Sequence, residues 1–120
     1  MSLKPLSHIS GRLHSNFLAE QGISAEVIDA ATLKPLDMGT ILASVEKTGR
    51  CVVVHEAART LGLGAEIGAE LAEKGLLFLM APVKRVTGYD TVIPLPRTEM
   101  RYLPSVARIL KAVREVLDFA

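Results

Sequence analysis

The residues that could carry out chemistry are few, and the most prominent pair is His55 and Glu56, directly after the apolar run Val52–Val54. In an open parallel sheet, ligands and partner surfaces meet the carboxyl ends of the strands, where polar residues that follow a buried strand would lie. The segment His55–Arg59 falls short of the zinc-protease helix motif because Arg59 occupies the place of the second histidine, and arginine cannot ligate zinc. Two interpretations remain: a polar strand end with local hydrogen bonds, or a contact with another subunit.

A second candidate is the glycine-rich segment Gly62–Gly68, which is similar to a dinucleotide-binding fingerprint. The segment has one residue too many before its last glycine and begins seven positions after His55. The fingerprint instead follows its strand directly and needs an acidic residue about 20 residues further on. The simpler interpretation is a turn followed by close packing of a helix on the sheet through Gly68. Nucleotide binding by a stand-alone α/β domain stays open as the alternative function.

The remaining nucleophiles and metal ligands lack a setting for catalysis. Cys51 lies between Arg50 and a run of valines, a position typical of a small core residue, whereas a nucleophilic thiol needs an exposed, electropositive environment. His8, His14 and His55 are not spaced as metal ligands. The sequence contains neither a phosphate-binding loop nor a nucleophile elbow. It therefore predicts no catalytic, cofactor-binding or metal site on this chain.

The composition indicates a single globular, soluble domain. Of the 120 residues, 49% are apolar and 22% are charged, which argues against a disordered chain. The net charge is only +1 and tryptophan is absent, so neither nucleic acid nor an anionic membrane is expected as a partner. A single cysteine excludes an internal disulfide and favours a reducing, cytoplasmic location. No signal peptide or membrane span is visible.

Alternating strands and helices would place these residues at one end of a parallel sheet. Three strands are expected, at Ser24–Asp29, Cys51–Val54 and Val83–Thr87. Three helices are expected, one from the N-cap Asp37 to Gly49, one over Ala65–Lys74, and one with Pro104 in its first turn. The last helix has the clearest apolar face, made of Val106, Ile109, Leu110, Val113, Val116 and Leu117. This βαβαβ pattern predicts helices on both faces of the sheet.

Five groups of residues, in their order and spacing, carry a resemblance to a known family. They are Ile28–Asp29 with Thr32–Asp37, Val52–Glu56, Gly62–Ile67, Ala81–Asp90 with Ile93–Pro94, and Tyr102–Val106 with Arg108–Ile109. Together they closely resemble the C-terminal domain of the beta subunit of 2-oxoacid dehydrogenase decarboxylating components. That family includes the pyruvate, branched-chain 2-oxoacid and acetoin dehydrogenases and belongs to the transketolase superfamily. The resemblance extends over Ile23–Leu117.

The resemblance implies a three-layer α/β/α domain with a mostly parallel five-stranded sheet. Residues 23–120 would form this domain, and residues 1–22 a divergent or truncated N-terminal edge. Within that edge we expect a weak strand around Leu6–Ser10 and a short helix that ends at Gly22. Met1–Leu3 could be a remnant of cloning and is set aside.

The resemblance also implies a role in assembly. In this family thiamine diphosphate, with Mg, lies between the alpha subunit and the N-terminal domain of the beta subunit, which this sequence does not contain. The C-terminal domain holds the alpha subunit and a second beta subunit together and helps to dock the acyltransferase core. The chain is therefore expected to bind no thiamine diphosphate by itself, to be non-catalytic alone, and to self-associate.

Two groups of residues are the candidates for these contacts. His55, Glu56 and Arg59 would lie at the strand-end edge that faces the rest of the assembly. Asp118 and Phe119, after the last helix, would lie near the subunit-binding domain of the acyltransferase.

Overall fold

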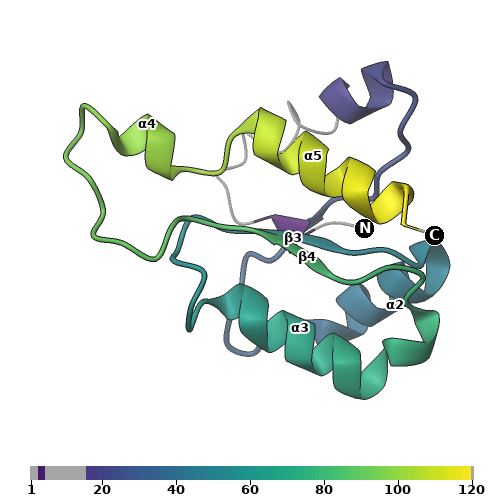
Figure 1. Cartoon of the computed structure of the whole chain (residues 1–120). Helices are drawn as coiled ribbons and strands as arrows, with labels where there is room; N and C mark the ends of the chain where they lie inside the picture. Colours follow the sequence, from purple (N-terminus) through teal and green to yellow (C-terminus); the bar gives the residue numbers. More distant parts are fainter. Residues whose placement is uncertain (1–2, 5–15, 120) are drawn as a thin grey trace.

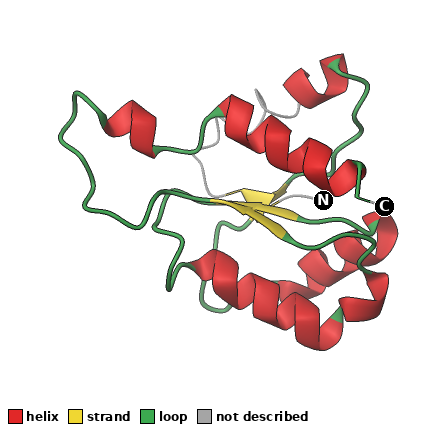
Figure 2. Ribbon diagram, in the orientation of Figure 1, coloured by secondary structure: helices red, strands yellow, loops and turns green. Residues whose placement is uncertain are grey.

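The computed structural model describes residues 3–4 and 16–119, and these form three layers (Figure 1). A parallel sheet lies between helix α5 on one face and helices α2 and α3 on the other (Figure 2). The strands are β1 (Leu3–Lys4), β2 (Ile28–Asp29), β3 (Val52–Val54) and β4 (Lys84–Val86). The helices are α2 (Met38–Thr48), α3 (Leu63–Lys74), the short 3-10 turn η1 (Leu76–Phe78), α4 (Glu99–Tyr102) and α5 (Val106–Leu117). Residues 16–20 are also helical.

The sheet has the strand order β2-β1-β3-β4, with every pair parallel. Four strands are present among the described residues, so the expected count of five is not confirmed. In the part of the chain that the structure describes, the expected strand Ser24–Asp29 is reduced to Ile28–Asp29, which pairs with the two residues of β1. Setting Leu3 aside was wrong, since it pairs with both Ile28 and Val53. The weak strand expected at Leu6–Ser10 lies outside the described residues.

The helix boundaries follow from local capping. The Asp37 carboxylate accepts a hydrogen bond from the backbone N of Thr40 at 3.1 Å, and α2 ends at Gly49, whose φ is 69°. The position expected for Pro104 was wrong: α5 begins at Val106 with Ser105 as its N-cap, so the proline precedes the helix. The short helix α4 was not predicted from the sequence.

The central strand divides the core into two apolar clusters, because successive side chains of a strand point to opposite faces. Val52 and Val54 belong to the cluster under α5, which also contains Val113 and Val116. Val53 belongs to the cluster under α2 and α3, together with Ile67. Both faces of β3 are therefore buried, as the continuous apolar run predicted.

Helix α5 is longer than the sheet that it covers. Its 12 residues extend about 18 Å, whereas the three residues of β3 or β4 extend about 10 Å. Ile109, Val113 and Val116 are buried as predicted, but Val106 and Leu117 at the helix ends are 42% and 38% exposed. These two residues were wrongly assigned to the core.

Candidate functional site

His55 lies at the carboxyl end of β3, where its backbone N donates to the carbonyl of Val86 at 3.1 Å. Its side chain is only 4% exposed, so it lies inside the domain rather than on a contact surface. Nδ1 lies 3.1 Å from the carbonyl oxygen of Ala57, which can only accept, so Nδ1 carries the proton. Nε2 is buried and has no hydrogen-bond partner among the described residues. Burial lowers the pKa of His55, and the nearby charge of Arg85 adds to this effect.

The glycines of the Gly62–Gly68 segment make room for this imidazole. A Cβ on Gly64 would lie 2.7 Å from Nε2 of His55, and one on Gly62 would lie 2.4 Å from the carbonyl of Ala58. The first turn of α3 therefore packs directly on the histidine. The close packing expected at Gly68 was wrong, since a Cβ there would meet nothing within 4 Å.

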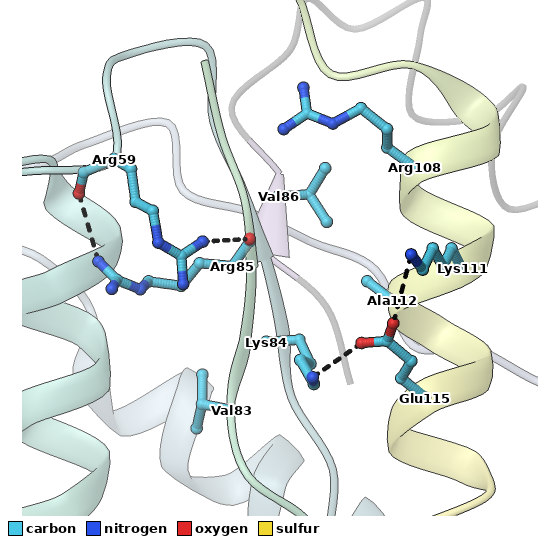
Figure 3. A pocket seen from close by; sticks show the side chains of 9 residues that line it. All are labelled: Arg59, Val83, Lys84, Arg85, Val86, Arg108, Lys111, Ala112 and Glu115. Atoms are coloured by element: carbon cyan, nitrogen blue, oxygen red, sulfur yellow. Dashed lines mark hydrogen bonds and ion pairs between the residues drawn. The ribbon is translucent and has the colours of Figure 1, made fainter. Parts of the chain in front are cut away.

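Glu56 and Arg59 are both exposed next to this buried centre. Nη1 of Arg59 donates to the carbonyl of Arg85 at 3.1 Å, and Nη1 of Arg85 donates back to the carbonyl of Arg59 at 3.3 Å (Figure 3). These reciprocal bonds join the loop after β3 to the edge strand β4. Of the three predicted residues, Glu56 and Arg59 are exposed and available to a partner, whereas His55 is buried beneath them.

A surface that sequence reasoning missed lies at the same end of the molecule. The loop after β4 projects beyond the sheet (Figure 1), and Asp90 anchors it by accepting from the backbone N of Thr60 at 2.8 Å and from its hydroxyl at 2.7 Å. These bonds lower the pKa of Asp90. We call the exposed apolar residues of this loop, together with Met100 of α4 and Leu61 next to Thr60, the carboxyl-end surface: Leu61, Tyr89, Val92, Ile93, Leu95 and Met100, between 49% and 98% exposed. The signal in the sequence was apolar residues within a proline-bearing loop.

Asp118 and Phe119 lie at the opposite end, where α5 finishes (Figure 1). Phe119 is 50% exposed, and Asp118 is the C-cap residue of α5, with its backbone N donating to the carbonyl of Arg114. Arg50 connects this end to the segment after α3, because its Nε donates to the carbonyl of Val116 at 2.7 Å and its Nη1 lies 3.9 Å from Sδ of Met80. The five predicted contact residues thus form two separate groups.

Comparison with known proteins gives the family of this fold. The family model for the transketolase C-terminal domain matches residues 15–109, which is most of the chain. The chain belongs to this family. A solved structure described as a split-gene transketolase, an inactive beta4 tetramer, has the same fold as this transketolase C-terminal domain. It superposes with a TM-score of 0.80 at 25% identity, covering 98% of this chain and 37% of that chain.

The curated relatives of this transketolase C-terminal domain include subunits of one enzyme. The chain is 47% identical to the pyruvate dehydrogenase E1 component subunit beta of Staphylococcus epidermidis over 102 residues. It is 48% identical to the subunits of the same name from Bacillus subtilis and Staphylococcus aureus. In each case the match covers 85% of this chain but only 31% of the relative. The chain therefore spans about a third of the length of these proteins.

The described residues contain no cluster of metal-ligating side chains. A divalent cation needs several oxygen ligands, and no group of three or more His, Cys, Asp or Glu side chains is close enough together in residues 3–4 and 16–119 to hold a metal. The absence of thiamine diphosphate binding remains a prediction. In the same part of the chain, no helix has the length and hydropathy that crossing a membrane requires.

Proposed function

We propose that the chain is an assembly domain of the beta subunit of a thiamine-diphosphate-dependent 2-oxoacid dehydrogenase and acts in the cytoplasm. Residues 23–120 would be the transketolase C-terminal-like domain of that subunit, without catalytic activity of its own. The identity of 47–48% with pyruvate dehydrogenase E1 beta subunits supports this assignment, and so does the match to about a third of their length. The thiamine diphosphate and Mg of the intact enzyme would lie on domains outside this chain.

The carboxyl-end surface is the observation that carries the proposal. Val92 is 89% exposed and Leu95 82% exposed, on a loop held in place by Asp90. Leu61 has a positive φ of 59° and is 98% exposed. A bulky side chain in this left-handed conformation is strained, and strained residues cluster at functional sites. Exposed apolar patches mark protein interaction sites, so we assign this surface to the alpha subunit and the second beta subunit.

The two groups of predicted contact residues take different roles in this proposal. Glu56 and Arg59 form a polar rim beside the carboxyl-end surface, and buried His55 positions the loop that carries them. Asp118 and Phe119 at the other end would contact the acyltransferase core. Because the two groups lie at opposite ends of the domain, a variant at one end should leave the contact at the other end unchanged.

Binding measurements with the two partners test this separation. The chain is mixed with the alpha subunit, and separately with the subunit-binding domain of the acyltransferase, from the same organism, and each affinity is measured by calorimetry. Ile93→Asp should weaken binding to the alpha subunit at least about tenfold, since it places a charge in an apolar contact, and leave acyltransferase binding unchanged. Phe119→Ala should give the reverse pattern. Equal affinities of wild type and Ile93→Asp for the alpha subunit would overturn the proposal.

A further inference from the structure

The loop between β4 and α4 carries Val92, Ile93 and Leu95 of the carboxyl-end surface and projects beyond the sheet (Figure 1). Among the residues that the structure describes, residues 91–97 form hydrogen bonds only within this loop. The direction in which the loop projects therefore depends on the contacts at its base, residues 87–90.

One side of the base is fixed to the loop after β3. The backbone N of Gly88 donates to the carbonyl of Ala57 at 3.0 Å, and Asp90 accepts from Thr60 as described above. A Cβ on Gly88 would lie 2.3 Å from the carbonyl oxygen of Glu56, so the close approach of the two loops requires glycine. This side of the base is therefore held by backbone groups and one carboxylate.

The other side of the base is held by Arg108, which extends from α5 toward the end of β4 (Figure 3). Its Nη2 donates to the carbonyl of Thr87 at 2.7 Å, and its guanidinium lies 4.6 Å from the centre of the Tyr89 ring. The Tyr89 ring also lies edge-on to the ring of buried Tyr102 in α4, with 6.3 Å between the ring centres and 69° between the ring planes. Contacts of both kinds are attractive, so Tyr89 is held from α4 and α5 together.

The contribution of Arg108 to the stability of the whole domain should be small. Its Nη1 is buried and has no hydrogen-bond partner among the described residues. Burying a donor without an acceptor is costly, and this cost offsets the gain from the bond to Thr87. The contacts of Arg108 with the loop can therefore be removed while the fold is kept.

We propose that Arg108 is a positioning residue for the carboxyl-end surface. Through Thr87 and Tyr89 it keeps the loop after β4 in the orientation in which a partner subunit binds it, so this inference rests on the proposed assembly role. A loop already held in its binding orientation loses less conformational entropy when the partner binds, which raises the affinity. Without Arg108 the base would be tied chiefly through Gly88 and Asp90, and the loop would open locally more often.

Hydrogen exchange of the backbone amides, measured by NMR on the full 120-residue chain, tests the positioning role. Every chain compared also carries Ile93→Asp, so that self-association cannot hide motion of the loop. Arg108→Gln should speed exchange at Gly88 and Thr60, whose amides bond at the base, at least about fivefold, and leave exchange at Leu71 in the core unchanged. The matched control Arg101→Gln, an exposed arginine of α4, should change each rate less than about twofold.

A second variant covers the case in which Arg108→Gln fails to fold. Tyr89→Leu removes the ring but keeps an apolar side chain, and it should also speed exchange at Gly88 and Thr60. Because the two residues act through one contact, the double variant should show less than the product of the two single effects. Exchange rates at Gly88 that stay within about twofold of the reference in the folded variants would overturn the proposal. An equal increase at Leu71 would do the same, since it would show loss of the fold rather than of the loop position.

Binding to the alpha subunit, without the Ile93→Asp change, tests whether the loop position matters to a partner. Arg108→Gln should weaken this binding at least about fivefold, and Arg108→Lys, which keeps a cation and a donor, should restore part of it. Unchanged affinity of Arg108→Gln would overturn the link to the partner. Exchange needs no partner, so unchanged exchange rates overturn the positioning role, whereas a wild type that does not bind the alpha subunit overturns the assembly role.

Discussion

The two faces of the sheet and its carboxyl end are built in different ways. Each face is an apolar cluster covered by helices, represented by Val113 under α5 and Ile67 under α3. The carboxyl end is held by polar bonds around buried His55 and presents apolar side chains such as Val92 to solvent. The faces therefore stabilise the fold, whereas we propose that the carboxyl end contacts another molecule.

The largest effect on stability should come from placing a charge in the apolar cluster on one face of the sheet. Val113 is 2% exposed, so Val113→Asp removes apolar burial worth about 1.5–3 kcal/mol and adds an unpaired buried charge. A domain of this size has about 5–15 kcal/mol of total stability, so we expect the variant to be unfolded by circular dichroism. Val106→Asp, on the exposed first turn of the same helix, should remain folded. A melting temperature of Val113→Asp equal to that of the wild type would show that this face is not core.

A smaller effect should come from crowding the carboxyl end. The added methyl of Gly64→Ala would press on the His55 ring, and overpacking of this kind costs about 1–3 kcal/mol. Gly68→Ala in the same helix meets no neighbour, so higher helix propensity should stabilise it by up to about 1 kcal/mol. Urea unfolding measures both variants. The packing described for His55 is wrong if the two variants change the free energy of unfolding in the same direction.

The smallest effect should be the pH dependence that buried His55 gives to the free energy of unfolding. Its folded-state pKa is lowered from 6.5, chiefly by burial. As the pH falls below about 6.5, the unfolded chain binds a proton that the folded chain does not, so the free energy of unfolding decreases; above that pH His55 contributes no dependence. Asp37 and Asp90, whose pKa values are also lowered, act only at more acidic pH. The decrease in the free energy of unfolding between about pH 6.5 and 5 should be smaller in His55→Gln than in the wild type. An identical dependence of this free energy on pH in the two proteins would refute the role of His55.

Elements that depend on neighbouring residues could be predicted from the sequence. Asp37 and Gly49 bound α2 because a side-chain cap and a positive φ are local requirements. The run Val52–Val54 gave the central strand because its continuous apolar pattern requires burial on both faces. The position of His55 at the carboxyl end of this strand followed directly from it.

Features that depend on distant contacts could not be predicted. Pairing of Leu3 with Ile28 and Val53 joins parts of the chain far apart in sequence. The burial of His55 depends on a helix that begins beside it at Leu63, two residues before the expected start. The exposure of Val92 depends on how Asp90 anchors its loop to Thr60. None of these contacts has a signal in local residue patterns.

Sedimentation equilibrium tests most directly whether the carboxyl end is an association surface. The experiment compares the wild type with two variants over a range of concentrations. One is Ile93→Asp at the carboxyl end, and the other is Leu77→Asp at the opposite end, where Leu77 is 96% exposed. We expect the wild type and Leu77→Asp to form a dimer or larger species, because an exposed apolar patch associates readily and two-fold contacts are the commonest. We expect Ile93→Asp to be monomeric. A wild type that stays at the monomer mass of 12.9 kDa up to about millimolar concentration would contradict the account.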